Sequence, residues 1–170
     1  MHNIQAVTGD TLRLDQQLCF ALHATSRAVT QAYAPLLAPL GVTYPQYLVL
    51  LVLWEEDGLT VSGLGTRLHL DSGTLTPMLK RLEGQGIVTR HRDTVDERVV
   101  RVALTMAGKR LRARADGIHD RVACAIGAPP SELVALRDSL QEILHRLHSL
   151  HTEAPATKIP APRTRKQRSR

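Results

Sequence analysis

Apolar residues recur at helical spacing over the first part of the chain and then become almost continuous. Residues 12–34 predict an amphipathic helix, one face of which carries Leu14, Leu18, Leu22 and Val29. Pro35 and Pro39 bound a short segment after it. The next run, YPQYLVLLVLWEE at 44–56, has few polar positions and predicts a buried central helix with Thr43 as its N-cap.

Two short helices and a hairpin are predicted next along the chain. Thr60 can cap a short helix over VSGLGTRLHL, and Asp71 or Ser72 can cap a second helix that continues through Leu82. Pro77 lies inside this second helix, so we expect its first turn to be loose or kinked. The apolar pattern then alternates in IVTRHRD and RVVRVALT, which the charged turn TVDE separates, and this predicts a β-hairpin.

The last part of the chain returns to helical spacing. Thr105 can cap a long helix over 106–126, GAPP breaks it, and Ser131 starts a final helix that ends near Leu150. The order of elements predicts a mainly α-helical fold with a small β-hairpin wing. Two short helices with a tight turn and a following hairpin are typical of a winged helix-turn-helix, whose second helix enters the major groove of DNA.

The composition is that of a single globular domain. The chain has 170 residues, of which 43% are hydrophobic, and it has no uninterrupted apolar run long enough to span a membrane. No basic segment followed by an apolar one opens the sequence, so we expect no secretory signal. With only two cysteines, the protein is expected to act in the cytoplasm, where thiols stay reduced.

The net charge of +6 is unevenly distributed along the chain. Residues 155–170 carry six Lys or Arg and no acid, so the remainder of the chain is balanced. The segment from Lys80 to Arg114, however, contains ten basic and four acidic residues. Such a basic stretch within a neutral body indicates contact with a polyanion, although charge alone leaves an ordinary solvated surface equally open.

The basic stretch includes residues suited to DNA. Small hydroxyl side chains near the N-terminus of the second short helix favour phosphate, and cations follow one turn later. At the wing, an arginine can enter a narrow minor groove, and an aspartate two residues earlier can hold it in place. The predicted DNA-binding residues are Ser72, Thr74, Thr76, Lys80, Arg81, Asp96 and Arg98. The alternative is a capped surface helix beside an exposed hairpin.

The segment DSGTLTPMLKRLEGQGIVTRHRDTVDERVVRVALTMAGK resembles the MarR family of bacterial transcription regulators. The resemblance rests on the recognition helix, the RLE..G.V.R run and the wing signature D.R...V.LT..G, and it extends over roughly residues 10–150. It implies a homodimer with intertwined terminal helices that binds double-stranded DNA at an inverted repeat. The expected organisation is an N-terminal arm at 1–11, a MarR-type domain at 12–150 and a basic disordered tail at 151–170. Within that domain, 12–40 and 106–150 would dimerise and 44–105 would bind DNA.

Cys19 and Cys124 are the candidate redox residues. QLCFAL at 17–22, Tyr33 and Tyr44 resemble the organic hydroperoxide resistance regulator (OhrR) branch of the MarR family. The resemblance implies that Cys19 senses peroxide, that the partner subunit's two tyrosines hydrogen-bond its sulfur, and that Cys124 is the resolving cysteine of the two-cysteine subgroup. His23 replaces a tyrosine found in some members.

Helix geometry adds a constraint of its own. Tyr33 lies 14 residues after Cys19, which is about 21 Å along a helix. A contact between the two side chains therefore requires a second subunit.

The expected mechanism begins when an organic hydroperoxide oxidises Cys19 to a sulfenic acid. Cys124 of the other chain then closes a disulfide, and the winged domains leave register with the DNA grooves. The apolar neighbours Leu18, Phe20 and Leu22 would surround a buried Cys19 and favour organic peroxides over hydrogen peroxide.

Two alternatives remain open. In the first, a MarR-type repressor is released by a small aromatic ligand, both cysteines are structural, and the pocket is lined by Tyr33, Tyr44, Tyr47 and Trp54. In the second, a thiol peroxidase uses Cys19 as its nucleophile, but no base is clearly paired with it. His145, His148 and His151 point to different sides of a helix. The sequence therefore predicts neither an enzyme, a cofactor nor a metal site.

Overall fold

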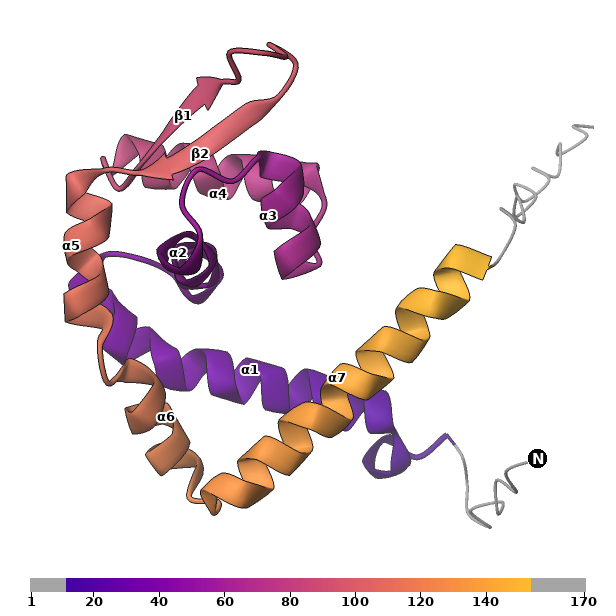
Figure 1. Cartoon of the computed structure of the whole chain (residues 1–170). Helices are drawn as coiled ribbons and strands as arrows, with labels where there is room; N and C mark the ends of the chain where they lie inside the picture. Colours follow the sequence, from indigo (N-terminus) through magenta and orange to yellow (C-terminus); the bar gives the residue numbers. More distant parts are fainter. Residues whose placement is uncertain (1–11, 154–170) are drawn as a thin grey trace, which may run out of the picture. The chain divides into compact units, whose positions relative to one another are not determined.

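The computed structural model describes residues 12–153, which form helices and one antiparallel hairpin (Figure 1). The predicted arm at 1–11 and residues 154–170 of the predicted tail lie outside the described residues. The predicted fold, mainly α-helical with a hairpin wing, is confirmed. In chain order the elements are η1 (Leu14–Gln16), α1 (Leu18–Leu37), η2 (Ala38–Leu40), α2 (Tyr44–Glu55), α3 (Val61–Leu68), α4 (Ser72–Gly84), β1 (Val88–Arg92), β2 (Val100–Leu104), α5 (Met106–Ala115), α6 (Ile118–Ile126) and α7 (Pro130–Glu153).

The chain forms two compact units that divide after Ile126. Helix α2 lies at the centre of the first unit and contacts α1, α3, α4 and α5. Its Val49 and Leu50 are fully buried, which confirms the predicted central helix. Each such side chain contributes about 1.5–3 kcal/mol through burial. The other side chains with almost no exposed surface are Leu37, Leu53, Leu64, Leu75, Leu79, Leu82, Val88 and Val102.

Side-chain caps fix where three helices begin. Thr60, Asp71 and Thr105 each accept a hydrogen bond from the backbone N–H three residues further on, at 2.9, 2.8 and 3.1 Å. These contacts satisfy amide groups that lack an intrahelical partner. Of the two candidates for the cap of α4, the structure selects Asp71 over Ser72.

A tight turn joins α3 to α4. His69 ends α3 in the left-handed conformation, with φ of 54°. Gly65 permits the close approach that follows, because a Cβ atom there would lie 2.6 Å from the carbonyl oxygen of Leu70. Helix α4 continues through Pro77. The two helices and their turn form the predicted helix-turn-helix.

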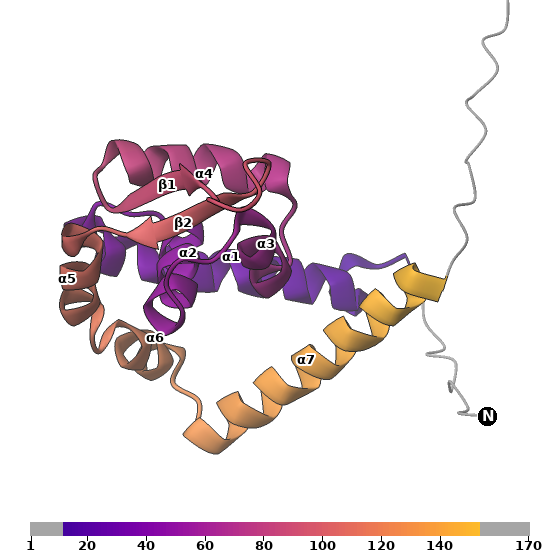
Figure 2. The ribbon, with the colours of Figure 1, turned by 45° about the horizontal axis from the view of Figure 1, so that its top comes forward.

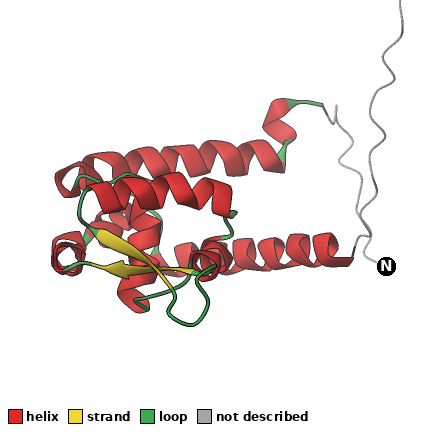
Figure 3. Ribbon diagram, turned by 90° about the horizontal axis from the view of Figure 1, so that it is seen from above, coloured by secondary structure: helices red, strands yellow, loops and turns green. Residues whose placement is uncertain are grey.

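The wing is a two-stranded hairpin that lies beside α4 (Figures 2 and 3). β1 and β2 are antiparallel, with Val88 opposite Leu104 and Arg92 opposite Val100, and residues 93–99 form the loop between them. The segment before α3 lies along the other edge of β2, where the Val102 N–H donates to the Leu59 carbonyl at 2.8 Å. The predicted hairpin is therefore confirmed.

Two predicted helices have different limits in the structure. The first helix was expected from residue 12 to 34, but α1 begins at Leu18, after an extended Gln17, and passes through Pro35 to Leu37. A proline in the last turn costs a single backbone hydrogen bond, so the helix can continue.

The long helix expected over 106–126 is divided into α5 and α6. Asp116 is extended there, with ψ of 140°. Gly117 follows with φ of +71°, a conformation that glycine adopts without strain.

The second unit is described through α7, a helix of 24 residues. It begins at Pro130, one residue before the predicted start, and continues to Glu153, three residues beyond the predicted end at 150. One face carries leucines that are 36–54% exposed in the single chain, namely Leu136, Leu140, Leu144 and Leu147. Helix α7, taken by itself, is therefore amphipathic with a continuous apolar face.

Candidate functional site

Helix α4 presents polar side chains on one face and buries Leu75, Leu79 and Leu82 on the other. The Thr74 hydroxyl donates to Asp71 Oδ2 at 3.0 Å, so this predicted DNA residue also belongs to the helix cap. The Asp71 pKa is lowered by these hydrogen bonds, those from the Thr74 backbone first. Asp71 therefore remains an anion and keeps the start of α4 in place.

The other predicted residues of α4 follow along the same helix. The Thr76 hydroxyl donates to the Ser72 carbonyl at 2.6 Å, which leaves the hydroxyl oxygen able to accept. Lys80 and Arg81 are exposed, and within residues 12–153 neither side chain forms an ion pair. Both cations are available to an external anion.

The wing places Arg98 beside α4. Asp96 Oδ1 accepts the Arg98 backbone N–H at 3.0 Å, so Asp96 holds the main chain of Arg98 and leaves its guanidinium group unconstrained. The sequence had predicted an association between these two residues, and the structure specifies which atoms make it. Asp96 and Arg98 are both exposed.

A cavity of about 370 Å³ between α3, α4 and the wing brings several of these residues together. Of the predicted residues, Ser72, Thr76 and Arg98 line it, whereas Thr74, Lys80, Arg81 and Asp96 do not. Sequence reasoning missed three further polar residues that line it, namely Thr60, Ser62 and Arg90. The concentration of hydroxyl groups and cations suits an oxyanion such as a backbone phosphate.

Arg90 fixes the relative position of the wing and α4. Its backbone N–H, Nε and Nη2 all donate to the Glu83 carboxylate, the last two at 3.0 and 2.5 Å. Arg90 lowers the Glu83 pKa. The sequence signal was a pair of opposite charges seven positions apart on either side of a helix end, which is too common to single out in advance.

Both cysteines are exposed and free in the single chain. Cys19 lies in the first turn of α1, and Cys124 lies on α6, whose Ile118 and Val122 are buried. The single chain therefore does not by itself bury Cys19 among apolar side chains, and the predicted burial of this thiol depends on a second subunit. The apolar residues near it are themselves exposed, at 62% for Leu18 and 42% for Phe20. His23, which replaces a family tyrosine, is exposed on the same helix.

The two tyrosines predicted to bind the thiolate lie against each other. The ring centroids of Tyr33 and Tyr44 are 4.7 Å apart, and Tyr47 lies 6.0 Å from Tyr33. Burial raises the pKa of all three phenols, and neighbouring phenols raise those of Tyr33 and Tyr47 further. The phenols therefore keep their protons and can donate hydrogen bonds to an anion such as a thiolate.

Cys19 and Tyr33 occupy the same continuous helix. A separation of 14 residues on that helix corresponds to about 21 Å along its axis. The structure thus brings the two tyrosines together but keeps them apart from the cysteine of their own chain.

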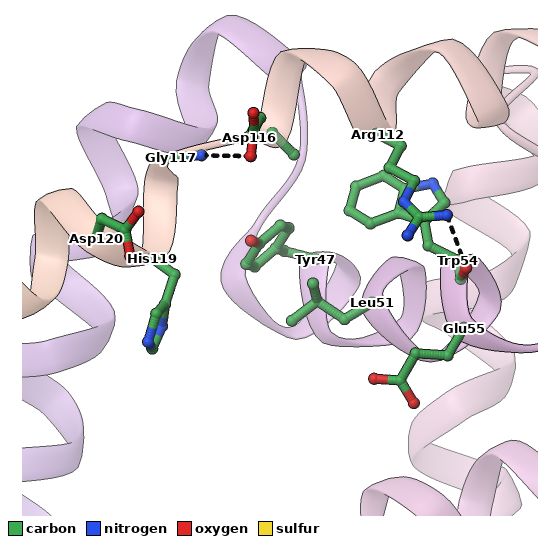
Figure 4. A pocket seen from close by; sticks show the side chains of 10 residues that line it. Tyr47, Leu51, Trp54, Glu55, Arg112, Asp116, Gly117, His119 and Asp120 are labelled. Carbon is green, nitrogen blue, oxygen red and sulfur yellow. Dashed lines mark hydrogen bonds between the residues drawn. The ribbon is translucent and has the colours of Figure 1, made fainter. Parts of the chain in front are cut away.

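A second cavity, of about 380 Å³, lies between α2, α5 and the start of α6 (Figure 4). Of the four aromatic residues expected in a ligand pocket, Tyr47 and Trp54 line it. The Trp54 indole N–H donates to the Gly108 carbonyl at 3.0 Å, and Arg112 donates to the Trp54 carbonyl at 3.3 Å. The cavity has aromatic walls and charged groups at its edge.

No group of three His, Cys, Asp or Glu side chains within residues 12–153 has the arrangement of a metal site. Over the same residues, no single helix has both the length and the apolar character to cross a membrane. The helices from Leu18 to Leu40 and from Tyr44 to Glu55 meet these criteria only as a pair bent by 70°.

Known proteins are similar to this sequence over most of its length. The sequence model of the MarR family matches residues 42–100. The chain is 48% identical to the HTH-type transcriptional regulator TtmR of Methylorubrum extorquens, over 94% of this chain and 81% of that protein. It is also 48% identical to the organic hydroperoxide resistance transcriptional regulator of Bacillus subtilis, over 82% of this chain and 95% of that protein.

Solved structures of AbfR of Staphylococcus epidermidis share the fold. Reduced AbfR bound to DNA is 39% identical with a TM-score of 0.66, and the match covers 81% of this chain and 95% of that one. The disulfide-formed AbfR is 38% identical with a TM-score of 0.55, and the match covers 79% and 94% of the two chains.

Proposed function

The chain belongs to the MarR family of DNA-binding transcriptional regulators, and we propose that it represses its target until an organic hydroperoxide oxidises Cys19. The 48% identity to the Bacillus subtilis hydroperoxide regulator supports the OhrR branch. The protein acts in the cytoplasm, as a homodimer on an inverted repeat of double-stranded DNA.

Each subunit reads DNA through α4 and the wing. In a two-fold dimer the two α4 helices enter successive major grooves, about 34 Å apart. Arg98 reaches the flanking minor groove, and α4 contributes hydroxyl groups and cations. The cavity shared by Ser72, Thr76 and Arg98 supports this assignment, because it aligns the helix and the wing on one surface. The DNA-binding residues are Ser72, Thr74, Thr76, Lys80, Arg81, Asp96 and Arg98.

Residues 44–105 form the DNA-binding part, and 12–40 with 106–150 form the dimer.

The observation that carries the redox proposal is the exposure of Cys19 among exposed apolar side chains, while the tyrosine pair lies further along α1 and on α2. A second subunit covers this end of α1 and brings its own Tyr33 and Tyr44 to the sulfur. Their protonated phenols stabilise the thiolate by donating to it.

The switch has two balanced steps. The Cys19 thiolate attacks one oxygen of the hydroperoxide, an S–O bond forms as the O–O bond breaks, and the alkoxide leaves and takes a proton from water to become the alcohol, so that Cys19 becomes a sulfenic acid. The Cys124 thiolate of the other subunit then attacks that sulfur, the S–O bond breaks, hydroxide leaves and takes a proton from solvent to become water, and an intersubunit disulfide forms. The bond pulls α1 of one subunit towards α6 of the other, and the winged parts lose their groove spacing.

A non-reducing denaturing gel tests the switch directly. Reduced full-length protein is treated with one equivalent of cumene hydroperoxide and compared with Cys19→Ser and Cys124→Ser. We expect a band of twice the monomer mass that dithiothreitol reverses and that neither variant forms. A monomer band with two free thiols after treatment would refute the redox switch.

A second candidate function is release from DNA by a small aromatic ligand. The cavity walled by Tyr47 and Trp54 is the observation that favours it. Comparing the wild type with Cys19→Ser separates the two functions. If an aromatic ligand releases the repressor and the cysteines are structural, both proteins leave DNA when the ligand is added, and neither responds to hydroperoxide.

A further inference from the structure

We propose that Asp93 is a positioning residue for DNA binding, which fixes wing Arg98 through a hydrogen-bonded chain anchored at the end of α2. The inference rests on the proposed function, because it takes Arg98 to be a DNA contact. It adds Asp93 and Arg101, neither of which was among the predicted DNA residues.

The anchor of this chain is the carbonyl oxygen of Gly58, just after α2. Arg101 on β2 donates one Nη1–H to that oxygen at 3.1 Å and its Nε–H to Asp93 Oδ2. The Asp93 side chain is 13% exposed, against 44% for Arg101, so the carboxylate is largely shielded from water. A shielded ion pair with two fixed partners resists screening by salt better than a surface pair.

The other carboxylate oxygen of Asp93 organises the wing loop. Oδ1 accepts the backbone N–H groups of Val95 at 2.9 Å and Asp96 at 3.3 Å. Asp96 in turn accepts the backbone N–H of Arg98 at 3.0 Å. A continuous polar path therefore runs from Gly58 through Arg101 and Asp93 to the main chain of Arg98.

Apolar packing does not order the tip of the loop. Val95 is 94% exposed, and 93–99 joins two strands without further secondary structure. Loops with little burial are ordered by their hydrogen bonds. The Asp93 pKa is lowered to about 2, first by Arg101 and then by the two loop amides, so the group is charged under all working conditions.

The loop contains a matched control residue. Glu97 is exposed on the same loop, and within residues 12–153 its carboxylate forms no ion pair or hydrogen bond; Arg92 contacts only its main-chain oxygen. Asp93→Asn and Glu97→Gln remove the same charge from the same loop. Any difference between them therefore comes from position and not from net charge.

The test uses the reduced full-length chain and a duplex selected by the wild-type protein from a random pool. Binding affinity and hydroxyl-radical footprints are measured for wild type, Asp93→Asn, Glu97→Gln and Arg98→Ala. We expect Glu97→Gln to bind at least as well as wild type, and Asp93→Asn to bind about tenfold more weakly. Asp93→Asn should lose protection of the flanking minor groove and keep the central major-groove footprint.

A double variant excludes a general structural role. If Asp93 acts through Arg98, Asp93→Asn adds nothing to the loss caused by Arg98→Ala, so the two effects are not additive. Arg101→Gln should reproduce the footprint of Asp93→Asn, and it supplies a second variant should the first fail to fold. Equal footprints for Asp93→Asn and Glu97→Gln would overturn this inference and leave the proposed function intact. Failure of the wild-type chain to select any duplex would overturn the proposed function with it.

Discussion

Cys19 is exposed near the start of α1, too far along the helix from Tyr33 of its own chain for that phenol to influence its reactivity. An exposed thiol has water as its main hydrogen-bond partner, whereas a phenol donor from a second subunit would stabilise its thiolate more strongly. Tyr33 is 8% exposed and keeps its proton, because burial raises its pKa. The tyrosine is thus able to donate a hydrogen bond in the monomer, and in the proposed dimer its acceptor would be the sulfur of the partner's Cys19.

Tyr33→Phe should therefore impair sensing and leave folding nearly intact. The variant keeps the ring that packs on Tyr44 and loses only the donor. A hydrogen bond to a charged group contributes about 1.5–3 kcal/mol, so we expect Cys19 to react with cumene hydroperoxide at least about tenfold more slowly. Stopped-flow thiol loss in a Cys124→Ser background measures this rate. Tyr47→Phe, in the same ring cluster, is the control, and equal slowing in both variants would contradict the assignment.

Asp93 should give the wing a distinct pH dependence. Its pKa falls from 3.8 to about 2 in the folded chain, so the stabilisation is fully present above about pH 4 and is lost as the pH falls through about 2. We expect the difference in Tm between wild type and Asp93→Asn to be constant near neutral pH and to shrink between about pH 4 and pH 2. Calorimetry at stepped pH measures it, and a constant difference down to about pH 2 would contradict the ion pair.

Residue roles were predictable where they depend on local sequence. The caps at Thr60 and Thr105 follow from their position just before an apolar helical pattern, and the structure has both. Asp93 and Arg101 could not be paired in advance, because their meeting across the hairpin depends on strand register and on the position of Gly58. Opposite charges on the two sides of a predicted turn were the available signal.

At the scale of elements, the first turn of α5 packs closely against the main chain just before β1. A Cβ atom on Gly108 would lie 2.2 Å from the carbonyl oxygen of Ile87. That oxygen belongs to the main chain and cannot rotate away. The first turn of α5 therefore requires glycine at this position.

Gly108→Ala should destabilise the protein by about 1–3 kcal/mol, the usual cost of overpacking a core. Denaturant unfolding of the two chains gives the difference in free energy. Gly84→Ala is the matched control, since nothing lies within 4 Å of its added Cβ and it ends a helix. The control should be neutral or slightly stabilising, and equal losses in both variants would show that the close approach to Ile87 has no energetic consequence.

Element types were predictable, and element limits less so. The hairpin followed from β-branched alternation, and the central helix from its apolar run. Pro35 predicts a helix boundary, but its position in the last turn allows α1 to continue to Leu37. Asp116 and Gly117 sit inside a helical pattern, and the break depends on a left-handed glycine that the pattern does not reveal.

At the scale of the whole molecule, α1 and α7 each carry large apolar side chains that are exposed in the single chain. A chain with exposed leucine stripes on two long helices gains burial by association. The periodicity of the sequence predicts these stripes, and the expectation of a dimer comes from the family resemblance. The arrangement of two subunits depends on contacts between chains, which one chain's sequence pattern does not specify.

Leu140→Glu with Leu144→Glu should convert the dimer into a folded monomer that binds DNA poorly. Both side chains lie on the exposed stripe of α7, at 36% and 38% exposure. Sedimentation equilibrium measures the mass, far-UV circular dichroism the helix content, and a gel shift the DNA affinity. Gln141→Glu with Ser149→Glu adds the same charge away from the stripe and should remain dimeric. A dimeric Leu140→Glu, Leu144→Glu variant would place the interface elsewhere.

Trp54 is the chain's single tryptophan, and its indole joins α2 to the start of α5 through the hydrogen bond to Gly108. Its ring also meets the edge of Tyr47 at a centroid distance of 6.1 Å. Indole emission is sensitive to both of these contacts, the neighbouring ring and the hydrogen bond from the N–H. The protein therefore carries a single intrinsic tryptophan probe at the contact between α2 and the first turn of α5. Movement of α5 relative to α2 can be followed in real time without attaching a dye.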